Sequence, residues 1–124
     1  MNYKLRTSKN TKHIFEAVGS AQGLQPFVLS KIAIALSIRA GELSENDFMT
    51  DNEGLELNRQ TIFGEYEDLF KALMTMEKKA ELSEQEFFPR LVKAHLDRGA
   101  RMLKNESRYG MSFYGNLLNL DQNL

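Results

Sequence analysis

The chain has 124 residues, of which 42% are hydrophobic and 27% are charged, and it contains no cysteine. This length and composition predict one globular domain over residues 1–124, with a modest hydrophobic core. The absence of cysteine excludes disulfides, iron–sulfur clusters, thiolate zinc sites and a cysteine nucleophile, and it fits a reducing, cytoplasmic environment. The first fifteen residues carry charge throughout, and Lys31 and Arg39 interrupt the longest apolar run. We therefore expect neither a signal peptide nor a membrane span.

Charge is divided unevenly along the chain, although the formal net charge is only -1. Residues 1–39 contain six basic residues and one acidic residue, residues 40–86 contain thirteen acidic and four basic residues, and residues 87–124 contain six basic and three acidic residues. Two basic segments around an acidic one favour a protein whose ends contact a polyanion while the acidic middle stays away from it. The alternative is a charge-mixed, solvated surface without that role.

The first predicted element is a short strand. In YKLRTS (residues 3–8), hydrophobic or neutral residues alternate with the basic Lys4 and Arg6, which is typical of a strand with an outward basic face. The next segment, HIFEAVGSA (13–21), has apolar residues at helical spacing, and a polar residue among 8–11 is expected to cap this helix. A strand followed by two helices resembles the ribbon-helix-helix arrangement, in which two chains pair their strands and present basic side chains to DNA. A plain N-terminal tail is the alternative.

The segment GLQPFVLSKIAIALSIRAGE is either a buried strand or a helix with almost no polar side. Pro26 suits the first turn of a helix, the alanines disfavour a strand, and Gly41 stands where a helix C-cap is expected, so we predict a helix. Lys31 and Ser37 fall in its one narrow polar arc. A helix that is apolar nearly all round must be covered on several sides. We therefore expect another copy of the chain to help bury it, in a homo-oligomer.

The middle of the chain is acidic and rich in turn-forming residues. The stretch ELSENDFMTDNEG (42–54) predicts an exposed connection, and it lacks the ligand spacing of a calcium loop. In LSEQEF, Ser83 and Glu86 form a predicted capping box. Pro89 then predicts either a kink or the start of the main helix. Before these residues, a helix from about Gly64 is expected to bury the apolar positions Tyr66, Leu69, Phe70, Leu73 and Ala80.

The last predicted helix covers roughly residues 89–105. One face is apolar and includes His95, which we expect to be a hydrogen-bonded core histidine rather than a ligand or a base. The closing SRYGMSFYGNLLNL is expected to pack as an arm on the domain or on a neighbour. The opposite face of the helix carries Asp97 among basic side chains, and it is a candidate second DNA-binding surface or simply a solvated cationic face. Its basic residues are Arg90, Lys93, Arg101 and Lys104.

The sequence shows no pattern typical of catalysis or of metal binding. It has no glycine-rich phosphate loop, no nucleophile elbow, and no histidine and carboxylate cluster at metal spacing. The two histidines, His13 and His95, do not suggest a catalytic dyad. We therefore expect a protein that is not an enzyme and that uses no cofactor and no metal.

We expect DNA contacts to come from the basic N-terminal part of the chain, through the phosphate backbone. Lys31 lies near the start of its helix, where the helix dipole and the ammonium group could act on the same phosphate. The residues expected to bind DNA are Lys4, Arg6, Lys9, Lys12 and Lys31.

Two blocks of the sequence resemble the DndE family of the bacterial DNA phosphorothioation system. The first is GLQPFVLSKIAIALSI, which follows a basic N-terminus, and the second is HLDRGARML, which begins at His95. Together they cover about a fifth of the chain. Threonine and arginine are common in the family at the positions of Gln22 and Lys31, so these two residues depart from the pattern, and the second conserves only the charge.

The resemblance implies a mainly α-helical, homo-oligomeric and tetrameric protein without catalytic residues. Such proteins accompany the enzymes that replace a non-bridging phosphate oxygen of DNA with sulfur, and they bind duplex DNA with a preference for nicks. The implied partners are double-stranded DNA, further copies of the chain and other DNA phosphorothioation proteins, and not a membrane. A ribbon-helix-helix repressor that reads base edges, and a structural adaptor that holds partner proteins, are the rival hypotheses.

Overall fold

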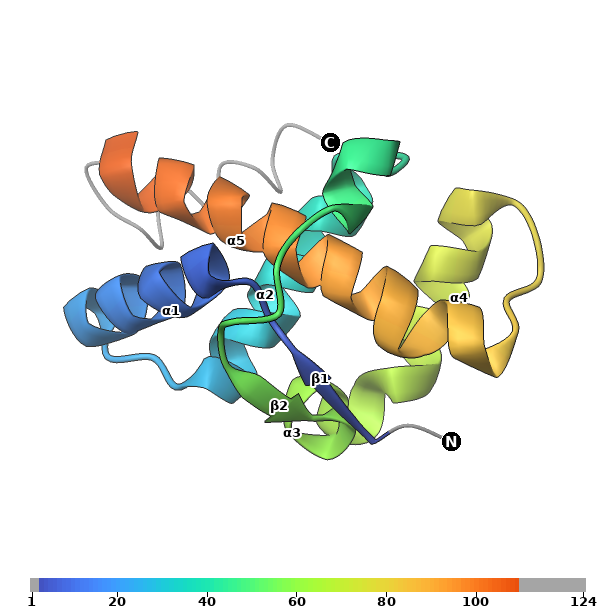
Figure 1. Cartoon of the computed structure of the whole chain (residues 1–124), viewed down its shortest axis with the longest axis horizontal. Coiled ribbons are helices and arrows are strands. Elements are labelled where there is room, and N and C mark those ends of the chain that lie inside the picture. Colours follow the sequence, from blue (N-terminus) through green and yellow to red (C-terminus); the bar gives the residue numbers. More distant parts are fainter. Residues whose placement is uncertain (1–2, 110–124) are drawn as a thin grey trace.

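The computed structural model describes residues 3–109, and this part of the chain is mainly helical (Figure 1). The longest helix, α5 (Val92–Tyr109), packs across α2 (Pro26–Arg39). Helix α1 (Lys9–Gln22) packs beside α5, and α4 (Glu67–Lys78) lies at the other end of the molecule. The predicted mainly α-helical fold is confirmed. The aromatic C-terminal arm lies outside the described residues, apart from the last turn of α5.

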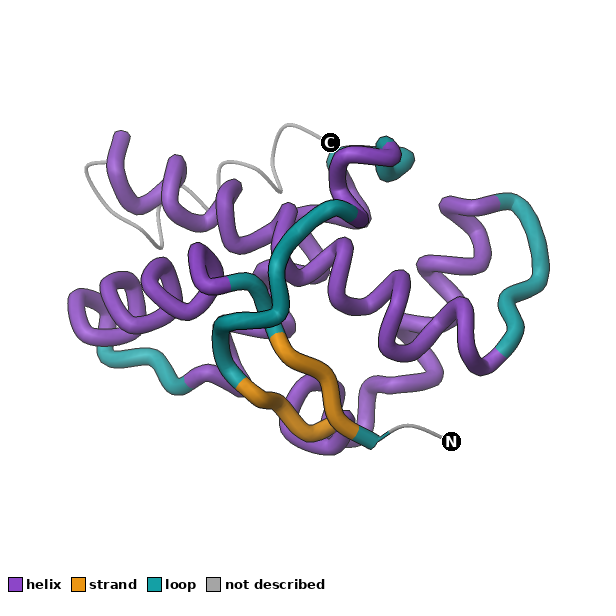
Figure 2. Tube along the Cα trace, viewed as in Figure 1, coloured by secondary structure: helices purple, strands orange, loops and turns teal. Residues whose placement is uncertain are grey.

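A two-stranded antiparallel sheet joins the N-terminus to the middle of the chain (Figure 2). Strand β1 (Lys4–Arg6) pairs with β2 (Glu56–Asn58), and Leu5 stands opposite Leu57. Both leucines are buried, which fixes the register because a slip by one residue would expose them. The predicted N-terminal strand and the order strand, helix, helix are confirmed, but the strand pairing of a ribbon-helix-helix protein is not present among the described residues. The partner strand belongs to the same chain, not to a second copy.

Helix α1 has the cap that the sequence predicts. The side chain of Ser8 accepts a hydrogen bond from the backbone N–H of Thr11 at 3.1 Å, as an N-cap residue does. The helix buries Ile14, Phe15 and Val18 against the core. It ends at Gly23, whose φ of 68° lies in the left-handed region that glycine adopts without strain.

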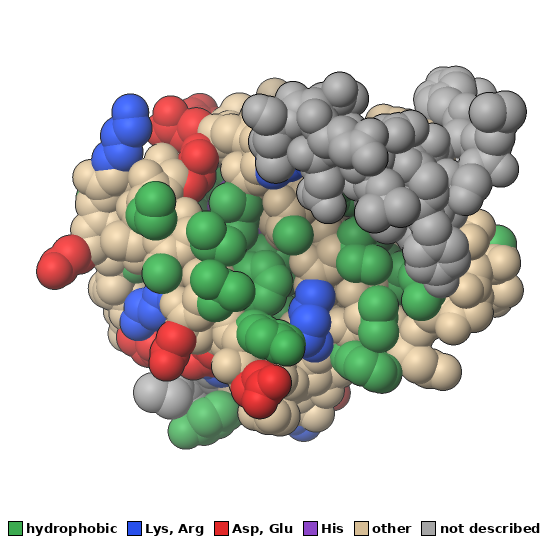
Figure 3. Space-filling view, turned by 180° about the vertical axis from the view of Figure 1, so that it is seen from behind, with side chains coloured by type: hydrophobic (Ala, Val, Ile, Leu, Met, Phe, Trp, Pro, Cys, Tyr) green, Lys and Arg blue, Asp and Glu red, His purple; other side chains and the backbone are tan. Residues whose placement is uncertain are grey.

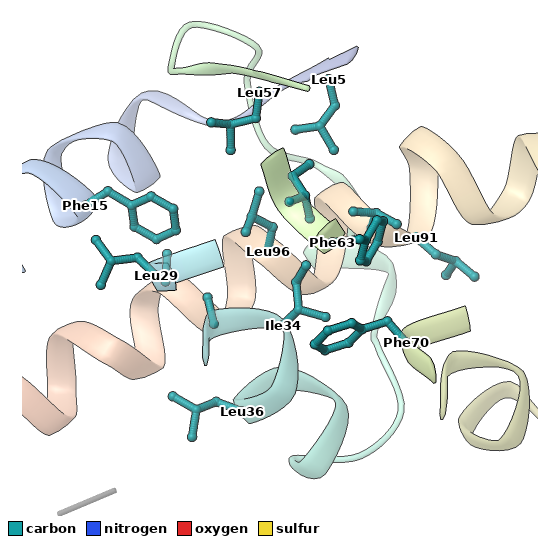
Figure 4. Packing of buried hydrophobic residues seen from close by; sticks show 14 of the residues in the cluster. Leu5, Phe15, Leu29, Ile34, Leu36, Leu57, Phe63, Phe70, Leu91 and Leu96 are labelled. Atoms are coloured by element: carbon teal, nitrogen blue, oxygen red, sulfur yellow. The ribbon is translucent and has the colours of Figure 1, made fainter. Parts of the chain in front are cut away.

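Helix α2 begins at Pro26 as predicted, but its own chain covers most of it. Leu29, Ala33 and Ile34 have no exposed surface, and Figure 4 shows Leu29 and Ile34 among side chains from several other elements. The polar arc is covered too, because Ser37 is also fully buried. A second chain is therefore not needed to explain why these residues are apolar, and the oligomer stays a prediction.

Glycine permits the close approach of α5 to α2. A Cβ atom placed on Gly99 would lie 1.8 Å from the carbonyl oxygen of Ala33, far inside van der Waals contact. Only a residue without a side chain fits at this crossing.

A kink precedes α5. The helical segment Glu86–Leu91 is interrupted at Phe88, whose backbone angles are not helical, directly before Pro89. The predicted kink at this proline is confirmed, and the N–H of Glu86 donates to the hydroxyl of Ser83, so this half of the predicted capping box is present.

The middle segment differs most from expectation. The short helix α3 (Arg59–Phe63) and strand β2 were not predicted. Helix α4 buries Phe70 and Met74, whereas Tyr66 and Leu69 are about half exposed. The buried face of α4 therefore differs from the predicted one. Tyr66 belongs to the preceding 3₁₀ turn and not to the helix. Among the described helices, no single one is long and apolar enough to cross a membrane, and α1 with α2 passes such a test only as a pair bent by 112°.

Candidate nucleic-acid interface

Four of the five residues expected to bind DNA lie close together along β1 and the start of α1. Lys4 and Arg6 are exposed because Leu5, between them, points into the core. Lys9 is exposed in the first turn of α1, and Lys12 is half-buried one turn later. We call Lys4, Arg6, Lys9 and Lys12 the β1–α1 basic group. The first turn of α1 carries no acidic residue, although acidic residues are favoured there by the helix dipole.

Acidic residues from the middle of the chain lie directly beside this group. The Glu56 carboxylate stands 3.9 Å from the ammonium of Lys4, with both side chains at least half exposed. Asp51 accepts hydrogen bonds from the backbone N–H groups of Glu53 at 2.9 Å and of Lys9 at 2.8 Å, which lower the pKa of its carboxyl group. The acidic segment therefore lies beside the basic one, and the expectation that it stays away from a bound polyanion stays a prediction. The pairing of β1 with β2 brings the two segments together.

Lys31, the fifth residue expected to bind DNA, lies on α2, and its side chain contacts α3. Its ammonium donates to the carbonyl oxygens of Phe27 at 3.1 Å and of Thr61 at 3.4 Å, and lies 5.4 Å from the centre of the Phe27 ring. The side chain is half-buried, and burial lowers its pKa. Two of its three N–H groups are therefore used within the chain. This leaves less of the ammonium for the phosphate contact that the sequence suggested.

The candidate second surface on α5 is largely occupied by contacts within the chain. Lys93 donates to Asp51 O at 2.9 Å and to Asp97 Oδ2 at 2.8 Å. Arg101 donates to the carboxylate of Asp47 at 3.0 Å. Because the two lysine contacts and the arginine contact are made internally, these cations are already neutralised in part.

The other two members of the second surface are exposed. The guanidinium of Arg90 lies 4.3 Å from the centre of the Phe48 ring, a cation–π distance. Lys104 projects from the outer side of α5. Arg101 is exposed as well, but its guanidinium is paired with Asp47.

Asp97 is buried and accepts several hydrogen bonds, so it does not belong to a solvent-exposed face of α5. The residue is 1% exposed. Its oxygens accept from the Ser8 N–H at 3.1 Å, the Thr11 hydroxyl at 2.6 Å and the Thr50 hydroxyl at 2.6 Å, in addition to Lys93. The prediction that Asp97 belongs to the solvated face of α5 is wrong. The start of α1 covers this part of α5, and a buried carboxylate is tolerated there because every contact neutralises or solvates it.

A second buried polar cluster joins α5 to the end of α2. The Ser37 hydroxyl and His95 Nδ1 are 2.8 Å apart, and Arg98 Nε donates to the same hydroxyl at 2.8 Å. Arg98 also donates to the carbonyl oxygens of Gly41 at 2.6 Å and Glu42 at 3.1 Å, directly after the C-terminal end of α2. Burial, with a smaller contribution from Arg98, lowers the pKa of His95 to about 4. The prediction of a hydrogen-bonded core histidine is confirmed.

Sequence reasoning missed the roles of Ser37 and Arg98. The two members of the Ser37–His95 contact are 58 positions apart, and no local spacing signals it. The pair is not a nucleophile with its base, because Ser37 is fully buried and its hydroxyl is shared with Arg98. Within residues 3–109, no three His, Asp or Glu side chains lie close enough together to hold a metal ion.

These features define a class, the small helical proteins with a basic group at their surface. More specifically, the chain belongs to the DndE family, because the family model "DNA sulphur modification protein DndE" matches residues 4–110. The resemblance seen in the two sequence blocks is thereby confirmed. Among curated proteins no match was found.

Two crystal structures are similar to the fold described here. One is DndE from Escherichia coli B7A, involved in DNA phosphorothioation modification, with a TM-score of 0.66 and 19% identity over 83% of this chain and 97% of that one. The other is a DndE variant, involved in DNA phosphorothioation, in which two glycines are replaced by lysine. Its TM-score is 0.64, with 16% identity over 82% of this chain and 97% of that one.

Proposed function

We propose that this chain is a non-catalytic accessory subunit of DNA phosphorothioation that binds duplex DNA through the β1–α1 basic group. One observation carries the proposal. Lys4, Arg6 and Lys9 present exposed side chains from adjacent elements, whereas Lys93 and Arg101 of the rival surface are bound within the chain. Exposed cations gain affinity for DNA by releasing the counterions that neutralise phosphates.

The acidic neighbours reduce this affinity but do not abolish it. The Lys4–Glu56 pair is exposed on both sides and 3.9 Å long, and such a pair is worth about 0–1 kcal/mol. Lys4 can therefore exchange its carboxylate partner for a phosphate at small cost. Asp51 accepts both of its backbone hydrogen bonds on Oδ1, and one of them comes from the N–H of Lys9 and not from its ammonium.

Association with further copies of the chain, up to a tetramer, belongs to the proposal. Hydrophobic side chains gather on the face shown in Figure 3. The exposed apolar residues include Phe27 on α2, with 49% of its surface exposed, and Leu69 and Met76 on α4, with 55% and 72%. Burial of these side chains between copies would supply a driving force. A symmetric oligomer would also repeat the basic group along a duplex.

A preference for nicked duplex is proposed on physical grounds. If the repeated basic groups require a bent duplex, a nick removes part of a deformation cost on the order of 1–6 kcal/mol. The absence of a catalytic role is supported by the buried position of Ser37, the most suggestive hydroxyl next to a histidine. The chain would then hold DNA for sulfur-transferring partners.

Fluorescence anisotropy with a labelled duplex, intact or carrying one nick in the same sequence, tests the proposal. We expect affinity to fall by orders of magnitude between about 50 and 200 mM salt, with nearly one unit of log–log slope for each phosphate contact. We also expect tighter binding to the nicked duplex, and no strand cleavage when the products are separated on a denaturing gel. Binding that does not respond to salt, or cleavage that follows protein concentration through repurification, would contradict it.

A further inference from the structure

A cavity lies between the 3₁₀ turn η1 (Glu45–Phe48), α4 and α5, and the functions proposed above do not use it. Its volume is about 70 Å³. Much of its wall is apolar and comes from three different parts of the chain, so the cavity is a product of the tertiary fold. It is lined by Leu43, Phe48, Met74 and Leu91, together with Glu42, Glu77, Lys78 and His95.

His95 contributes an unpartnered polar atom to this cavity. The residue is 2% exposed, and its Nδ1 is bonded to Ser37. Its other ring nitrogen, Nε2, makes no hydrogen bond to the described part of the chain. Every fully enclosed side-chain nitrogen or oxygen in that part has a partner, so Nε2 must face open space. The cavity that His95 lines is that space.

The partners of Ser37 determine which ring nitrogen of His95 carries the proton. The hydroxyl has one hydrogen, and its oxygen already accepts from Arg98 Nε. The arrangement that satisfies both groups has Ser37 donating its hydrogen to Nδ1 of His95, which must then be unprotonated. Neutral imidazole carries its single proton on the other nitrogen. Nε2 is therefore an N–H donor that faces the cavity.

We propose that this cavity binds a short, uncharged group that carries one hydrogen-bond acceptor, such as a carbonyl, with its oxygen on Nε2 of His95. A cavity of about 150 Å³ with apolar walls holds benzene, so one of about 70 Å³ suits three or four heavy atoms. The apolar walls match small alkyl substituents. A bound charge would lose part of its hydration against Phe48 and Met74. In addition, Glu42 and Glu77 would repel an anion, and Lys78 and the Nε2–H group would repel a cation.

An ordered water is the competing occupant. A buried water makes about three hydrogen bonds, but Leu43, Met74 and Leu91 offer it none, and of the charged lining residues Glu42 and Lys78 are exposed to solvent. A carbonyl with methyl groups uses the Nε2–H donor of His95 and also covers the apolar wall. It therefore fits the cavity better than water does.

Acetone is a suitable probe because it has four heavy atoms and one acceptor. We expect a saturable shift of the His95 Nε2–H resonance and of the Met74 methyl resonance during titration, followed by NMR. Leu43→Phe should fill the cavity and abolish both shifts. Shifts that grow linearly without saturation, or that persist in Leu43→Phe, would overturn the proposal, as would a water on Nε2 that acetone does not displace.

Two substitutions of His95 separate the roles of its nitrogens. Glutamine places an N–H donor near the position of Nε2, whereas asparagine places its amide near Nδ1. We expect His95→Gln to retain acetone binding, and His95→Asn to bind several-fold more weakly, as the loss of one hydrogen bond predicts. Equal binding by both folded variants would contradict the role of Nε2. If either variant fails to fold, the wild-type titration and Leu43→Phe decide the matter.

A second probe identifies the source of the group. N-acetylglutamine methylamide offers the same type of carbonyl at the end of a peptide side chain. Tighter binding of this compound than of acetone indicates a side chain of a partner protein, and binding of acetone alone indicates a free small molecule. Binding of neither compound would overturn the proposal. DNA binding plays no part in these measurements, so their outcome is independent of the proposed function.

Discussion

The α2–α5 crossing and the β1–α1 basic group both depend on polar residues, but they use them in opposite ways. At the crossing, Asp97 and Arg98 make several hydrogen bonds each within the chain. Lys4 and Lys9 instead extend into solvent from short elements. A buried charge must be paired inside the fold, whereas an exposed one is free to meet a partner. The charges that can serve binding are therefore those that the fold leaves without strong internal partners.

The block HLDRGARML, which resembles the family, lies at the crossing of α5 with α2. His95 bonds to Ser37, Asp97 fixes the start of α1, and Gly99 lets α5 touch α2. Each of these residues has a structural role. The block is therefore a feature of the fold, and it does not by itself indicate a function.

The largest expected effect comes from a side chain at the crossing. Gly99→Val would place atoms on the carbonyl of Ala33, 1.8 Å away already for a Cβ atom. Because both partners are helix backbone, the helices must separate, and we expect a loss of about 3 kcal/mol or more in unfolding free energy. Urea denaturation measures it. Gly19→Ala is the control, since its Cβ would meet Leu24 O at 2.8 Å, and it should cost clearly less. Similar costs for both would contradict the close crossing.

Acid should weaken the crossing through His95. Burial lowers its folded pKa to about 4 from the ordinary 6.5, so the unfolded chain binds more protons in between. The stability that neutral His95 contributes is complete above pH 6.5 and is lost as the pH falls toward 4, by up to about 3 kcal/mol. Urea unfolding at a series of pH values measures this, and His95→Gln should lack this part of the pH dependence. Parallel curves for the two proteins would refute the pKa shift.

A smaller effect should come from the acidic edge of the basic group. Asp51→Asn removes a negative charge near Lys9 but keeps an oxygen that can accept the same backbone hydrogen bonds. We expect affinity for duplex DNA to rise about two- to threefold at low salt and the gain to shrink as salt screens it. Anisotropy titrations measure the change. Asn52→Asp, one position along, is the matched control with an added charge, and it should lower affinity by a similar factor. A lower affinity for Asp51→Asn would contradict the position of the DNA.

The sequence predicts those elements whose signals are local. Ser8 as a cap, Pro26 at a helix start and the kink before Pro89 are each visible within a few residues. Strand β2 could not be found in this way, because it has three residues and exists through its pairing with β1, about fifty positions earlier. The covering of α2 by its own chain was missed for the same reason, since it depends on α5.

The sequence predicts where the basic side chains of the candidate site lie, but not which residues surround them. The alternation in β1 correctly predicts that Lys4 and Arg6 point outward. It does not reveal that Glu56 would stand beside them, or that Asp97 would be buried by Ser8, 89 positions away. Such partners follow from tertiary contacts, and a charge count along the chain cannot supply them.

Charge reversal on the two basic surfaces shows which of them binds DNA. One variant carries Lys4→Glu and Lys9→Glu, and the other carries Arg90→Glu and Lys104→Glu, so the net charge changes equally and all four residues are exposed. Affinity for the same nicked duplex is measured at one salt concentration, after circular dichroism shows that both variants fold. We expect affinity to fall at least about tenfold in the first variant and much less in the second. The reverse order would move the DNA to α5, and two unchanged affinities would contradict DNA binding by either surface and leave an adaptor.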